Sequence, residues 1–123
     1  MHPILERFEH AKTYSPEGFC CISAAFYLSG IDPEEKLRSP GYIETYSDRL
    51  IRVPALEEAM AIGMEQADDP GNILHLMVCH PEDPFLIMHR EGLDDPMTTD
   101  LKDPPLRYLA ECGVYRPVFF RVD

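Results

Sequence analysis

The sequence has no hydrophobic run long enough to cross a membrane. Its longest apolar stretch is residues 19–28, interrupted only by Ser23, whereas a membrane-spanning helix needs about 18 or more apolar residues. The first residues also lack the basic segment followed by an apolar segment that marks a secretory signal peptide. We therefore expect no membrane association and a cytoplasmic location.

Positive charge is scarce. The chain carries 11 Lys and Arg residues against 22 Asp and Glu residues, a net charge of −11, and no basic stripe interrupts this pattern. Nucleic acids and anionic membrane surfaces reward clustered cations, so we expect neither as a partner. An acidic surface suits a basic protein partner through steering and specificity, although the same charge also serves simple solubility.

Glycine-rich phosphate loops are missing as well. The seven glycines are spread thinly, and neither G-x-x-x-x-G-K-[ST] nor G-x-G-x-x-G occurs, so nucleotide binding through such loops is unsupported and we predict no cofactor. Four cysteines are present, but Cys20 and Cys21 are adjacent within the apolar run. That layout is poor for a secreted disulfide framework and favours free thiols in a reducing compartment.

With 123 residues and 45% hydrophobic composition, the chain is long enough for one domain, residues 1–123, with its own core. Hydrophobic periodicity, proline starts and glycine stops predict its elements. We predict helices at residues 3–13, 16–29, 32–38, 54–67 and 104–112, and strands at residues 42–53 (two short ones), 73–79, 85–89 and 117–122.

These elements alternate without a regular βαβ rhythm, which is typical of the α+β class. We expect a two-layer domain in which helices cover one face of a mixed or mostly antiparallel sheet of four to five strands. The helix at about 16–29 is apolar on nearly every side, so it is the expected buried central helix.

Cys20 and Cys21 are the most interesting candidates for chemistry. A thiol near a helix N-terminus feels the positive end of the helix dipole, which favours the thiolate. His75, on a strand expected to cross beneath this helix, would then serve as the base. In chain order the sequence is similar to papain-like and cell-wall-hydrolase cysteine enzymes, although the Gly- or Ser-rich surroundings of their nucleophile are missing. The alternative is that both cysteines are small core residues.

A metal site in the hairpin is disfavoured by geometry. Strand side chains alternate between faces, so His75 and Cys79 share a face that His80 does not. If the turn pairs His80 with Phe85, His89 lies opposite Leu76 on the face of His80, and those two histidines are about 13 Å apart along the strands. We therefore predict no metal.

The segment 91–103 is expected to be a long acidic loop. Its acids could bind a basic partner, and a loop of this length in so small a domain is commonly functional or mobile. Asp103, before two prolines, is better explained as a helix cap. The predicted binding residues are Glu91, Asp94, Asp95 and Asp100.

Two functional hypotheses follow. The first is a non-enzymatic interaction or regulatory domain that binds a basic protein through its acidic surface. The second is a small cysteine-dependent hydrolase or thiol enzyme with Cys20 or Cys21 as nucleophile and His75 as base. The oligomeric state is left open.

Overall fold

The computed structural model describes residues 2–13, 21–31, 49–90 and 97–122. Three helices and one 3-10 turn accompany six strands in this part of the chain. In chain order the elements are α1 (Pro3–Thr13), α2 (Cys21–Leu28), β1 (Leu50–Val53), η2 (Leu56–Glu58), β2 (Ala61–Gln66), β3 (Ile73–Cys79), β4 (Leu86–His89), β5 (Thr98–Leu101), α4 (Asp103–Cys112) and β6 (Tyr115–Val122).

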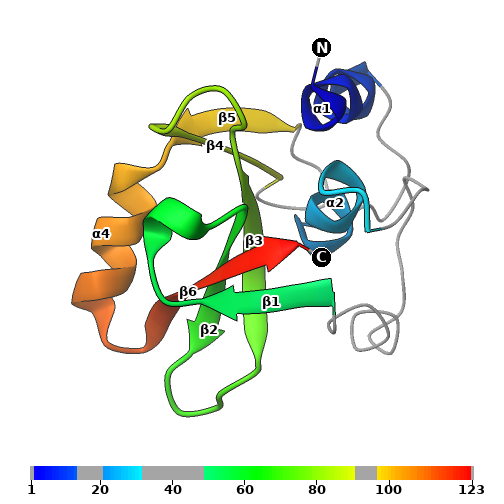
Figure 1. The fold of residues 1–123 in the computed structure, drawn as a ribbon. Helices are drawn as coiled ribbons and strands as arrows, with labels where there is room; N and C mark the ends of the chain where they lie inside the picture. The colour runs from blue at the N-terminus through cyan, green and yellow to red at the C-terminus, as the bar shows by residue number, and fades with distance from the viewer. Residues whose placement is uncertain (1, 14–20, 32–48, 91–96, 123) are drawn as a thin grey trace.

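The strands form one sheet in the order β1-β6-β2-β3-β4-β5 (Figure 1). Every pairing is antiparallel. The α+β class is therefore confirmed, whereas the expected count of four to five strands is wrong, because β2 and β5 come from segments that the sequence pattern assigned to a helix and a loop. The C-terminal strand β6 lies inside the sheet, so the two edge strands are β1 and β5.

Helices cover both faces of the sheet, not one face as expected (Figure 1). On one face, apolar residues of α1 and α2 pack against Leu76, Val78 and Phe120. On the other face, Leu56 and Leu106, from η2 and α4, pack against a second cluster. Its fully buried members are Ile62, Met77 and Ile87. Side chains alternate along each strand, so these two clusters identify which face each strand residue occupies.

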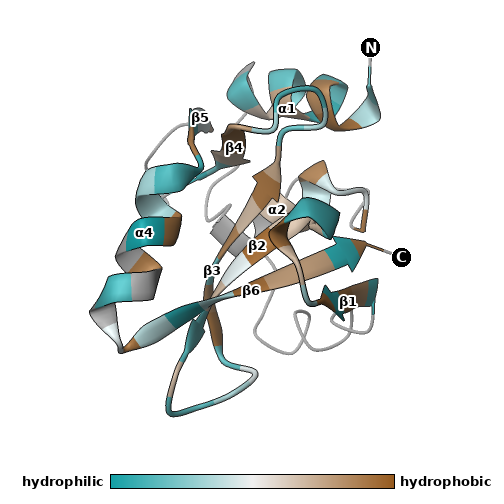
Figure 2. Cartoon of the chain, turned by 60° about the vertical axis from the view of Figure 1, so that its left-hand side comes forward, coloured by the Kyte–Doolittle hydropathy of each residue, from teal (hydrophilic) through white to brown (hydrophobic). Residues whose placement is uncertain are grey.

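Three elements match their predictions closely. The first helix spans Pro3–Thr13, and the central strand is Ile73–Cys79. The helix that begins at Asp103 ends at Cys112, and Gly113 follows as its C-cap, with a φ of +72° in the left-handed conformation that glycine adopts without strain. Along α4, hydrophilic and hydrophobic residues alternate, as expected for a helix with one side on a sheet (Figure 2).

The predicted buried helix is described only from Cys21 onward, because residues 14–20 lie outside the described part, as do residues 32–48. Within α2, Ala24, Phe26 and Leu28 are almost completely buried. The helix ends at Gly30, whose φ is +82°, as its sequence signal predicted.

The helix predicted over residues 54–67 is wrong. This segment forms the short turn η2 and then β2, whose residues are buried on both faces. A strand that is buried on both faces does not show the alternation of apolar and polar residues that identifies a half-buried strand. Its apolar residues can therefore also fit the spacing of a helix, which is why a helix was predicted here. Gly63 explains the tight packing of β2, since a Cβ there would lie 3.0 Å from the Phe120 ring and 3.1 Å from a Val118 methyl. Met60, expected in the core, is exposed.

No helix within the described ranges is both long and apolar enough to span a membrane.

Candidate functional site

Three side chains form a hydrogen-bonded row across neighbouring strands β3, β4 and β5. Nε2 of His75 lies 2.9 Å from Nδ1 of His89, and Nε2 of His89 lies 2.7 Å from Oδ2 of Asp100. Thr98 also donates its hydroxyl to Oδ2 of Asp100, at 3.3 Å. We call His75, His89 and Asp100 the histidine row.

The register of the hairpin brings the row together. Cys79 pairs with Ile87, and Val78 pairs with Met88, so His89 continues the ladder opposite Met77. The predicted position of His89, opposite Leu76, is wrong by one residue. Because a shift of one residue moves a side chain to the other face, His89 lies on the face of His75 and not on that of His80.

His89, in the middle of the row, is 7% exposed, while His75 is partly buried. Burial and, secondarily, the positive charge of His89 lower the pKa of His75 from 6.5 to about 4. His75 is therefore neutral at pH 7, and its Nδ1 has no hydrogen-bond partner in the part of the chain that the structure describes.

The chain of hydrogen bonds assigns the tautomers when both rings are neutral. As a carboxylate, Asp100 only accepts hydrogen bonds, so Nε2 of His89 carries the hydrogen. Nδ1 of a neutral His89 is then an acceptor, and Nε2–H of His75 donates to it. This arrangement leaves the lone pair on Nδ1 of His75, which is the atom of the row available to take a proton.

The predicted nucleophiles are not placed beside His75 by any described contact. Cys20 lies outside the described residues, and so does the side chain of Cys21, the first residue of α2. The packing partners of α2 on β3 and β4 include Leu76, Val78 and Met88, which face the side of the sheet opposite to His75. A thiol–His75 pair therefore stays a prediction.

Of the four predicted acidic binding residues, Glu91, Asp94 and Asp95 lie outside the described part. Asp100 was expected in a loop, but it lies on strand β5. Its side chain, which is 50% exposed, contacts His89. Asp103 does not cap α4 but lies in its first turn, where it pairs with Arg107.

The other hairpin residues considered as metal ligands have separate roles. Nδ1 of His80 accepts hydrogen bonds from the backbone N–H groups of Glu82 and Asp83, so His80 shapes the turn. Burial raises the pKa of the Cys79 thiol, an effect that Lys102 partly offsets. Among the described residues, no group of three or more His, Cys, Asp or Glu side chains is arranged to hold a metal ion.

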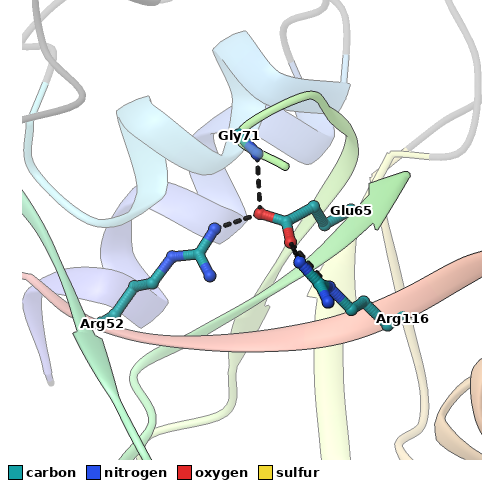
Figure 3. Close-up of polar contacts among 4 residues, drawn as sticks. All are labelled: Arg52, Glu65, Gly71 and Arg116. Atoms are coloured by element: carbon teal, nitrogen blue, oxygen red, sulfur yellow. Dashed lines mark hydrogen bonds and ion pairs between the residues drawn. The ribbon is translucent and has the colours of Figure 1, made fainter. Parts of the chain in front are cut away.

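A second polar cluster lies on the opposite face of the sheet and was not predicted (Figure 3). The Glu65 side chain, which is 0% exposed, forms ion pairs with Arg52 of β1 and Arg116 of β6. Nε of Arg116 donates to Oε1 at 2.8 Å, and Nη2 of Arg116 lies 2.7 Å from the same oxygen as the ion pair. Arg52 and the backbone N–H of Gly71, at 3.0 Å, donate to Oε2.

These hydrogen bonds and ion pairs all stabilise the ionised form of Glu65. Burial alone raises its pKa, but the hydrogen bond from Gly71 and the pairs with Arg116 and Arg52 outweigh that effect and hold the pKa below 4.5. The sequence shows only part of this cluster, the single acid Glu65 within the segment that forms β2. Its arginine partners belong to two other strands, and only the strand pairing brings them beside Glu65.

Comparison of the chain with protein-family models, with curated proteins and with solved structures finds no match.

Proposed function

We propose that this protein is a hydrolase in which His75 is the general base. The histidine row carries the proposal, because a base must be neutral, oriented and able to disperse the proton that it takes. His75 meets the first condition through its lowered pKa and the second through its hydrogen bond to His89. Asp100, hydrogen-bonded to His89, supports the third, because its carboxylate can stabilise the positive charge that the proton brings to the row.

In the proposed reaction, Nδ1 of His75 removes a proton from the attacking nucleophile. The proton on Nε2 of His75 can pass to Nδ1 of His89, so that the positive charge resides beside the Asp100 carboxylate. The nucleophile adds to the carbonyl carbon of an ester or amide, and the leaving group departs with a proton returned from His75. General base catalysis of this kind contributes roughly 10²–10⁴-fold in rate.

We consider two nucleophiles, and the geometry favours the first, because α2, which begins at Cys21, packs on the sheet face opposite to His75. One is water, which reaches the partly exposed His75 directly. The other is the thiol of Cys20 or Cys21, as the sequence layout suggested, and this route would proceed through a thioester that water then hydrolyses. Alkylation with iodoacetamide separates them, because it abolishes the thiol route and leaves the water route intact.

The test is hydrolysis of a panel of chromogenic esters and amides by the wild type and by His75→Ala. We expect kcat/KM to fall at least about 100-fold in the variant. His10→Gln, at an exposed histidine of α1, is the matched control and should retain wild-type activity. Equal rates for His75→Ala and the wild type, or no hydrolysis of any substrate by the wild type, would refute the proposal.

The other sequence-based hypothesis, a cytoplasmic non-enzymatic domain that binds a basic protein, rests on the net charge of −11. Its described acids are distributed over α1, η2, two turns, the strands β2 and β5, and α4, and some of them pair within the chain, such as Glu9 with Lys12. A pull-down at low salt whose captured protein is released at high salt would support this function in place of the hydrolase.

A further inference from the structure

We propose that Arg52 and Arg116 form a binding site for an oxyanion, a phosphate or carboxylate group, on the face of the sheet opposite to His75. The site differs from the proposed hydrolase site in residues and in position. It rests on the cluster in Figure 3, in which one buried carboxylate holds two arginines from different strands.

Glu65 has no further capacity to bind. Its two oxygens accept three hydrogen bonds, from Arg116, Arg52 and the backbone of Gly71, and Oε1 also forms an ion pair with Nη2 of Arg116, so both oxygens are occupied within the chain. The side chain is completely buried. Its role toward a ligand is therefore to position the arginines.

The two arginines, in contrast, retain binding capacity. Their side chains are 54% and 48% exposed. Each guanidinium has five N–H groups, and each donates one hydrogen bond to Glu65, with Nη2 of Arg116 also in ion-pair contact. Neither guanidinium makes a further hydrogen bond within the part of the chain that the structure describes. Two cations against one anion leave the cluster with a net charge of +1.

The chemistry of the two arginines suits an oxyanion. Guanidinium groups bind carboxylates and phosphates through paired N–H donors. Holding two of them in place in advance reduces the conformational entropy lost on binding. Arg52 is further constrained by the Phe120 ring, whose centroid lies 6.0 Å from its guanidinium carbon.

Stability alone is a weak reason for such a cluster. Replacing a buried ion triad by packed apolar residues is often neutral or stabilising. The chain has a net charge of −11, so its overall electrostatic field repels anions. The two arginines on neighbouring strands provide a local positive charge, and an anion would therefore bind here through direct contact with them.

The experiment measures binding of inorganic phosphate and, separately, of acetate to the full chain by NMR titration of the arginine Nε–H signals, with chloride at equal ionic strength as reference. We expect saturable shifts at Arg52 and Arg116, and the stronger of the two ligands identifies the source of the oxyanion. Arg52→Gln should weaken binding about tenfold, the usual effect of losing one charge-assisted pair.

Arg121→Gln is the matched control, because this exposed arginine of β6 lies on the other face, and it should bind as the wild type does. Arg52→Lys keeps the charge without the fork and should also bind more weakly. His75→Ala should leave the affinity unchanged, which separates this site from the hydrolase site. The proposal is overturned if neither anion shifts these signals beyond chloride, or if Arg52→Gln and Arg121→Gln bind equally.

Discussion

The lowered pKa of His75 predicts that acid destabilises the protein through this residue. Its pKa falls from 6.5 in the unfolded chain to about 4 in the folded protein. The folded state therefore binds fewer protons than the unfolded state between these values. The contribution of His75 to the free energy of unfolding is therefore fully present above pH 6.5 and is lost as the pH falls through about 4.

The magnitude comes from the size of the shift. A difference of about 2.5 units at about 1.36 kcal/mol per unit corresponds to roughly 3 kcal/mol. His75 is only partly buried, so solvent screening reduces this value, and we expect about 1.5 kcal/mol.

The assay is urea unfolding of the wild type and of His75→Gln at pH 7, 5 and 4. We expect the free energy of unfolding of the wild type to fall by about 1.5 kcal/mol more than that of the variant between pH 7 and 4. Other titrating groups cancel in this difference. His10→Gln should behave as the wild type.

An NMR titration of the imidazole nitrogens provides a direct readout, with an expected midpoint for His75 near 4. A midpoint near 6.5, or identical pH dependence of stability in the wild type and His75→Gln, would refute the reasoning. In that case neither burial nor the charge of His89 governs this residue.

Three further predictions concern other residues. Asp100→Asn should lower kcat/KM of the proposed hydrolysis about tenfold or more, because an amide can donate to His89 and reverse its tautomer; unchanged kinetics would remove Asp100 from the row. Glu65→Gln should reduce the free energy of unfolding at pH 7 by about 1–3 kcal/mol, since it leaves two arginines without their counter-charge. Because the pKa of Glu65 is lowered, this difference should be present above pH 4.5 and shrink as the pH falls below that value, which urea unfolding at pH 7 and 3 would check. Gly63→Ala should cost about 1–3 kcal/mol by thermal unfolding, because the new methyl group would lie 3.0 Å from the Phe120 ring; an unchanged melting temperature would contradict that.

The two sites also differ in how they depend on the rest of the fold. The histidine row needs only the pairing of β3, β4 and β5. The arginine cluster needs β1, β6 and β2, which join segments more than 50 residues apart in sequence. Unfolding of the terminal strand β6 would therefore destroy the arginine cluster before the histidine row.

The sequence by itself determined what depends on neighbouring residues. The helix over residues 3–13, the central strand Ile73–Cys79 and the stop at Gly113 are local features, since capping, propensity and backbone conformation act within a few residues. The α+β class followed from them. His75 was also identified as a candidate base, because its strand was expected to cross beneath the helix at about 16–29.

The tertiary structure decided everything that depends on register and on which face a residue occupies. A one-residue difference in the pairing of β3 and β4 turned His89 from an unrelated histidine into the partner of His75. Burial on both faces made β2 resemble a helix in its pattern, because alternation is visible only when one face meets water. Glu65 could not be linked to Arg52 and Arg116 from the sequence, since long-range strand pairing leaves no local signal.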